Sequence, residues 1–257
     1  MYEDYLTGKY GSIKYVSDAK GNRMELSETY VEPQDGMNIN LTINFEIQQA
    51  LERELDNAVS RYNPDQAIGI VMDPNTGEVL AMSSRPNFSP TNYKDYSKEE
   101  INRNLPIWAT YEPGSTFKII TLATALEEKL IDLDKDTFTD TGSVNVAGAR
   151  IKCWKHGGHG TQTLLQVVEN SCNPGFVYIG QKIGKETLFK YIKNFGFGSK
   201  TGIDLNGESK GILFKEENVG PVELATTSFG QGVSVTPIQQ VVAVSAAING
   251  GYIYQPY

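Results

Sequence analysis

The sequence is poor in the features that would place it in several common protein classes. Its 257 residues include only two cysteines and two histidines, and 23 Lys and Arg stand against 31 Asp and Glu. The resulting net charge of −8 argues against nucleic acid as a partner. No stretch reaches the roughly 18 consecutive apolar residues that span a membrane. Residues 1–6 are acidic and lack the apolar segment of a signal peptide, so the chain is either cytoplasmic or has lost a targeting segment.

The order of the expected elements indicates an α+β fold. Residues 1–36 are polar and rich in turns, and we expect an arm or the foot of a preceding domain there, with residues 37–257 forming the main domain. Apolar periodicity predicts a helix over 44–62, and two β-rich runs around the turn sequence 73–77 predict a hairpin. A polar loop comes next and leads to a helix that begins near residue 115. After that helix, a loop-rich stretch extends to about residue 160. Further helices are expected over 162–170, 174–183, 185–194 and 237–250.

A serine and a lysine three residues apart are the first candidates for chemistry. A turn sequence leads into a helix that carries Ser115 and Lys118, and residues at i and i+3 lie on one face of a helix. Lysine can take the proton of a serine hydroxyl when burial lowers its pKa, and the apolar run 119–126 predicts such burial. The pattern alone is weak, because an isolated Ser-x-x-Lys is usually a solvated pair. A second one, at Ser17 and Lys20, lies in a polar segment.

A second pattern, Ser171-x-Asn173, has two interpretations. Asn173 precedes Pro174 and could cap the next helix, while Ser171 merely ends the previous one. Another Ser-x-Asn, at Ser143 and Asn145, lies in a predicted loop, so this pattern is also common. The combination is more informative, because Ser-x-x-Lys followed by Ser-x-Asn between two helices is the motif set of penicillin-recognising enzymes.

Longer segments resemble the transpeptidase domain of class B penicillin-binding proteins. The resemblance covers roughly residues 38–257 and depends on Glu-Pro-Gly-Ser-Thr-Phe-Lys at 112–118, Asn-Ser-Cys-Asn at 170–173, a Phe-Gly-Phe-Gly segment at 195–205, and Phe-Gly-Gln-Gly with Thr-Pro-Ile-Gln at 229–239. Further phrases at 151–155, 173–176 and 220–227 resemble the sporulation members of the family, which cross-link spore-cortex peptidoglycan. The resemblance implies the fold shared with serine β-lactamases, an antiparallel sheet flanked by helices.

One part of the family pattern is expected outside this chain. The family has a third motif, Lys-Thr-Gly, on a strand beside the serine. Lys200-Thr201-Gly202 has those letters but stands inside the Phe-Gly-Phe-Gly segment, which relatives carry in addition to the true motif. We therefore expect the true motif, and three of the family's five sheet strands, beyond Tyr257.

The resemblance also implies a reaction that needs no cofactor. Ser115 would attack the terminal D-Ala-D-Ala of a peptidoglycan stem peptide after Lys118 takes its proton, and the backbone N–H of Ser115 would form half of an oxyanion hole. Ser171 would relay a proton to the leaving group, and Asn173 would hold Lys118 and the substrate. β-Lactam antibiotics would stop at the acyl-enzyme. A glycosyltransferase would be the partner enzyme, and an anchor absent from this chain would hold the protein at the outer face of the bacterial cytoplasmic membrane. The resemblance then implies that the arm 1–36 is the root of a pedestal or dimerisation domain.

Other functions use the same two motifs. A β-lactamase would need a base for a deacylating water, and no Glu-x-x-x-Asn loop placed for that role follows Ser171. A β-lactam sensor would bind without turnover, and a scaffold would have lost catalysis. The missing loop disfavours a β-lactamase, whereas the sequence alone does not separate a scaffold from a transpeptidase.

Both cysteines and both histidines lie close together in the sequence, which suggests a metal site. Two thiolates and two imidazoles can bind zinc tetrahedrally, so we predict a structural zinc site made of Cys153, His156, His159 and Cys172. Four protein ligands leave no position for water, which argues against a zinc hydrolase. A disulfide between the cysteines, or residues kept without a metal, are the alternatives. If one histidine is not a ligand, we expect a nearby carboxylate or water to replace it.

Overall fold

The computed structural model describes residues 2–24 and 29–257, apart from the side chain of Glu100, and divides the chain into two units, Met1–Thr42 and Ile43–Tyr257. This division falls later than the boundary after residue 36 that was expected from the sequence. The first unit contains a short helix, α1 (Glu3–Leu6), and two antiparallel strands, β1 (Ser12–Lys14) and β2 (Thr29–Val31). No helix among the described residues is long and apolar enough to cross a membrane.

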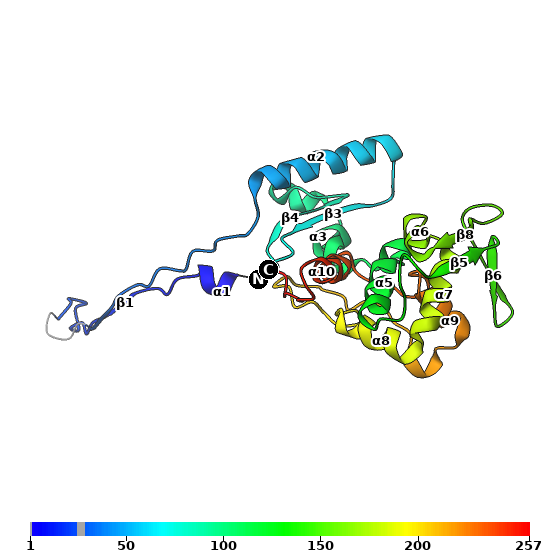
Figure 1. The fold of residues 1–257 in the computed structure, drawn as a ribbon. Coiled ribbons are helices and arrows are strands. Elements are labelled where there is room, and N and C mark those ends of the chain that lie inside the picture. Colours follow the sequence, from blue (N-terminus) through cyan, green and yellow to red (C-terminus); the bar gives the residue numbers. More distant parts are fainter. Residues whose placement is uncertain (1, 25–28) are drawn as a thin grey trace. The chain divides into compact units, whose positions relative to one another are not determined.

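The second unit begins with the predicted helix and hairpin. Helix α2 (Phe45–Tyr62) starts at Asn44, whose side chain accepts the backbone N–H groups of the first turn. Strands β3 (Ala67–Met72) and β4 (Val79–Arg85) pair antiparallel, and α2 packs across them (Figure 1). A Cβ on Gly69 of β3 would lie 2.5 Å from the Leu51 side chain of α2, so glycine permits this close packing.

A group of helices around α5 holds the main hydrophobic core. The 3₁₀ helix η3 (Gly114–Phe117) leads into α5 (Lys118–Glu127). Three further helices contact α5, namely α7 (Asn173–Ile183), α8 (Lys185–Asn194) and α10 (Pro237–Ile248) (Figure 1). Phe117, Phe176 and Leu188 are almost fully buried, and each such side chain contributes about 1.5–3 kcal/mol. The other helices of this region are α6 (Leu164–Glu169), η4 (Glu216–Asn218) and α9 (Pro221–Thr227).

Two segments that were expected to be loops contain regular structure. Between residues 137 and 163 the chain forms two small antiparallel pairs, β5 (Thr137–Asp140) with β8 (Gly160–Thr163) and β6 (Ser143–Val146) with β7 (Ala149–Lys152). The segment before η3 contains η2 (Pro90–Asp95), α3 (Lys98–Asn102) and α4 (Leu105–Trp108). The strands have only four residues each, so they leave little periodicity in the sequence.

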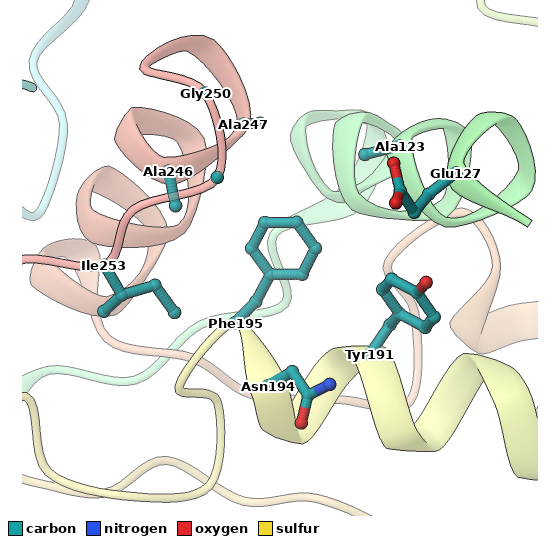
Figure 2. Close-up of a pocket in the computed structure, with 10 residues that line it drawn as sticks. Ala123, Glu127, Tyr191, Asn194, Phe195, Ala246, Ala247, Gly250 and Ile253 are labelled. Carbon is teal, nitrogen blue, oxygen red and sulfur yellow. The ribbon is translucent and has the colours of Figure 1, made fainter.

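A cavity of about 540 Å³ lies between α5, α8 and α10, with Phe195, Tyr191 and Glu127 among its lining residues (Figure 2). Glu127 is the last residue of α5, whereas Lys118 is the first. The cavity is therefore at the opposite end of this helix from the predicted catalytic lysine.

Candidate active site

The ammonium group of Lys118 connects the two predicted motifs. Only 4% of this residue is exposed, and its Nζ donates to the Ser171 carbonyl at 2.8 Å, to Ser171 Oγ at 2.9 Å and to Asn173 Oδ1 at 2.7 Å. These bonds use all three N–H groups of the ammonium. Burial lowers the pKa of Lys118 to about 8, although the nearby thiols of Cys172 and Cys153 act to raise it.

The turn between α6 and α7 presents these acceptors to the lysine. Helix α6 begins with a capping box at Thr163 and ends just before Ser171, which has a left-handed backbone with φ of 48°. Asn173 is the first residue of α7, and Cys172, without a side-chain cap bond, is the N-cap. The interpretation of Asn173 as a helix cap is therefore wrong, since its side-chain oxygen accepts from Lys118.

Ser115 lies on η3, one turn before Lys118, and its side chain is exposed. Side chains three residues apart are nearly eclipsed in a 3₁₀ helix, so Ser115 and Lys118 share a side of this segment. Among the described residues, the hydrogen bonds of Lys118 Nζ go to Ser171 and Asn173 rather than to Ser115. Catalytic contacts of this kind often form only with substrate bound.

A neighbouring segment supports the turn that carries Ser115. Tyr111 exchanges two backbone hydrogen bonds with Val235, and the N–H of Gly114 donates to the Gly230 carbonyl at 2.9 Å. Glu112 accepts the N–H of Gly232 at 2.8 Å. The Phe-Gly-Gln-Gly segment that was noted in the sequence without a role therefore lies directly behind the turn of the predicted nucleophile.

The sequence Lys200-Thr201-Gly202 lies in a loop rather than on a strand. The buried carboxylate of Glu208 accepts from the backbone N–H and the hydroxyl of Thr201, both at 2.6 Å, and from the N–H of Gly202 at 3.2 Å. The side chain of Gln255 donates to the Gly202 carbonyl. These contacts stabilise the loop, in agreement with the expectation that this is not the family's third motif.

A compact group of potential metal ligands lies beside the Ser171 turn. One ligand atom from each of Asp140, Cys153, His159 and Cys172 lies within 4.8 Å of all the others. Both cysteines are free thiols in the structure. His156 is exposed and is not part of the group. Three of the four residues predicted to bind zinc are therefore brought together, and Asp140 stands in place of His156.

The donor set of this group fits a divalent metal such as zinc. Burial would raise the pKa of Asp140, but hydrogen bonds from the side chains of Cys153 and His159 and from the backbone N–H groups of Gly142 and His159 lower it to about 2. The Nε2 atom of His159 is buried and has no hydrogen-bond partner among the described residues. Burial also raises the pKa of Cys172 to about 12. A metal would have to displace the thiol protons, as zinc does when it binds cysteine.

Comparisons with known proteins show the family of the chain. Residues 67–257 match the family model described as penicillin binding protein transpeptidase domain. The chain is 60% identical over 257 residues, all of its length, to stage V sporulation protein D of Bacillus subtilis, and 32% identical over 256 residues, 99% of its length, to the peptidoglycan D,D-transpeptidase FtsI of Escherichia coli. It spans 40% and 42% of the lengths of these relatives.

A solved structure gives the same fold. The crystal structure of penicillin binding protein 2X from Streptococcus thermophilus superposes with a TM-score of 0.82 at 30% identity, over 99% of this chain and 37% of that one. The expected α+β transpeptidase fold is thereby confirmed. From the matched family model and this similarity, the chain belongs to the family of penicillin-binding protein transpeptidase domains.

Proposed function

We propose that this chain is the catalytic part of a serine D,D-transpeptidase that cross-links peptidoglycan stem peptides. The main support is Lys118. Its amine is buried, has a lowered pKa and is hydrogen-bonded to Ser171 and Asn173, and it lies one turn from the exposed Ser115. A buried lysine of this kind can act as a general base near neutral pH.

The proposed reaction proceeds through an acyl-enzyme on Ser115. Neutral Lys118 takes the hydroxyl proton as Oγ attacks the carbonyl carbon of the penultimate D-alanine. The peptide bond then breaks, and the terminal D-alanine leaves with a proton delivered through Ser171. An amine from a neighbouring strand attacks the acyl-enzyme, forms the new peptide bond and frees Ser115. Asn173 holds Lys118 and the substrate amide in place throughout.

Charge on the carbonyl oxygen also needs stabilisation during this reaction. The backbone N–H of Ser115 lies in the first turn of the continuous η3–α5 segment, where N–H groups have no partner within the helix. We assign it half of the oxyanion hole, an arrangement that is worth several kcal/mol in other acyl-transfer enzymes.

A time course with a penicillin and a peptide amine separates the related functions. The full-length protein should form a penicillin adduct that lasts for hours and should join a D-Ala-D-Ala donor peptide to an acceptor amine. Rapid release of hydrolysed penicillin would indicate a β-lactamase. A stable adduct without peptide joining would indicate a sensor or a scaffold.

The biological setting is proposed from the relatives. Similarity to a protein named for stage V of sporulation supports a role in spore peptidoglycan. Such a substrate lies outside the cytoplasmic membrane, so we place the protein at the outer face, held by an N-terminal anchor. A glycosyltransferase that makes the glycan strands would be its partner, and β-lactam antibiotics would inhibit it.

We also propose a structural zinc ion in the group of Asp140, Cys153, His159 and Cys172. The support is the ligand set itself: two sulfurs, one imidazole and one carboxylate are buried or partly buried within 4.8 Å of one another, in a number and type that zinc prefers. When bound, zinc would supply a cross-link rather than chemistry. It would join β5 and the loop after β7 to the turn that carries Ser171.

A further inference from the structure

The segment between β5 and the end of α6 differs in charge from the rest of the protein. The chain carries 31 acidic residues, yet none occurs from residue 141 to 168, whereas Arg150, Lys152 and Lys155 all lie in that stretch. We call residues 150–156 the basic loop. It comprises the end of β7 and the turn after it. In a protein of net charge −8, this loop is a local site where an anion would be attracted rather than repelled.

An exposed tryptophan lies at the centre of the basic loop. Trp154 is 67% exposed, although its indole N–H donates to the Asn170 carbonyl at 2.8 Å. Its ring also packs edge-on against His159, with 5.3 Å between ring centroids. Both contacts hold the ring in one position while most of its surface stays in solvent. Rigid exposed aromatic rings are typical of ligand-binding surfaces, because little conformational entropy is lost on binding.

The position of Trp154 ties the basic loop to the candidate active site. Asn170, which accepts the indole N–H, directly precedes Ser171. Ser171 in turn accepts two hydrogen bonds from Lys118. The basic loop is therefore bonded to the turn that holds Lys118, next to the candidate active site.

We propose that the basic loop is a subsite for the carboxylate-bearing part of the stem peptide, with the Trp154 ring packed on its C–H groups and with Lys152 and Lys155 pairing with its carboxylates. The inference rests on the proposed transpeptidase function and adds a contact remote from the reacting bond. Lys152 and Lys155 are exposed and form no ion pair with described residues, so both are available to a ligand.

An anionic membrane surface is the other partner that lysine and tryptophan together can bind. The structure favours the peptide, because the indole N–H holds the Trp154 ring against the turn beside Lys118. A ring that binds a membrane would not need this contact with the candidate active site. The test therefore includes vesicles.

The experiment measures peptide affinity in the full-length protein with Ser115→Ala, which prevents turnover. The probes are a synthetic stem pentapeptide ending in D-Ala-D-Ala with its carboxylates free, and the same peptide with the side carboxylates amidated. By calorimetry, we expect the peptide with free carboxylates to bind more tightly than the amidated peptide. The double variant Lys152→Gln, Lys155→Gln should bind it about five- to tenfold more weakly and lose the preference, as expected for two exposed ion pairs.

Matched variants distinguish the contribution of the lysine charges, the contribution of the Trp154 ring and a general loss of folding. Trp154→Leu should weaken both peptides alike by about five- to tenfold, the loss expected for an aromatic face, while Lys190→Gln on α8, also an exposed lysine, should change neither affinity. Thermal melting checks that each variant is folded.

Unchanged peptide affinity in the folded Lys152/Lys155 and Trp154 variants would overturn the proposal. So would loss of binding to phosphatidylglycerol vesicles with peptide binding intact, which would assign the loop to a membrane. Failure of the proposed function has a different signature: the wild-type protein would not join a D-Ala-D-Ala donor peptide to an acceptor amine, whatever the peptide affinities.

Discussion

At the scale of single residues, the account depends on the protonation of Lys118. Burial lowers its pKa to about 8, and only the neutral amine can accept the Ser115 proton. At pH 7 about a tenth of the lysine would be neutral. We therefore expect the rate of acylation by penicillin to rise with pH and to level off above about pH 8. Stopped-flow measurements from pH 6 to 10 check this, and a rate independent of pH over that range would contradict the role of Lys118.

The left-handed backbone of Ser171 allows its hydroxyl to be tested separately from its conformation. Glycine adopts a φ of 48° freely, whereas alanine pays about 1 kcal/mol for it. We expect Ser171→Gly to melt at a higher temperature than Ser171→Ala, while both lose transpeptidation because both lack the relay hydroxyl. Wild-type turnover in Ser171→Gly would show that the hydroxyl is not needed.

The zinc proposal makes opposite predictions for two residues. Removing a ligand with Asp140→Ala should abolish bound zinc and lower the melting temperature, because the metal no longer joins its loops. His156→Ala should retain about one zinc per chain, since His156 is exposed and outside the group. Metal analysis of protein purified with a reductant tests both. Zinc retained by Asp140→Ala but lost from His156→Ala would restore the ligand set expected from sequence, and a Cys153–Cys172 disulfide would exclude the site.

At the scale of elements, the turn of the nucleophile depends on its contact with the Phe-Gly-Gln-Gly segment. Gly230 has a φ of 82°, and a Cβ there would overlap the Gly114 carbonyl oxygen. Gly114 also has a positive φ, of 55°, but open space surrounds its Cβ position.

These two glycines form a matched pair for substitution. Gly114→Ala should cost about 1 kcal/mol of unfolding free energy from backbone strain alone. Gly230→Ala should cost roughly 3 kcal/mol or more, because the clash adds to the strain. Denaturant unfolding measures both. Equal losses would mean that the close approach of the two segments does not stabilise the turn.

Elements with strong local signals could be predicted from the sequence. Helix α2 has an apolar stripe and an Asn44 cap, the hairpin β3–β4 has a clear turn, and α10 has a capping box at Thr236. The pairs β5–β8 and β6–β7 were not predicted, because four-residue strands carry little alternation. Strand β5 finds its partner twenty or more residues away, so that pairing depends on tertiary contacts rather than on local propensity. Strands β6 and β7 are joined by the two-residue turn Ala147-Gly148, a local signal that was not recognised in the sequence.

At the scale of the whole molecule, the sequence placed the catalytic candidates better than the metal ligands. Lys118, Ser171 and Asn173 meet in the structure because their motifs flank packed helices. Asp140 was missed because it precedes the Cys-His segment in the sequence. Only the pairing of β5 with β8 brings it to His159, so that Asp140 Oδ2 lies 2.9 Å from His159 Nδ1. An acidic residue gives no sign in the sequence that folding will bury it.

The most direct test of the central claim is to identify the residue that penicillin acylates. The full-length protein should be treated with a penicillin and digested, and the adduct located by mass spectrometry. The account predicts one adduct, on Ser115, that disappears in Ser115→Ala and forms about 10²–10⁴ times more slowly in Lys118→Ala, the usual loss for a general base. An adduct on Ser17 or Ser171, or labelling that survives Ser115→Ala, would contradict it.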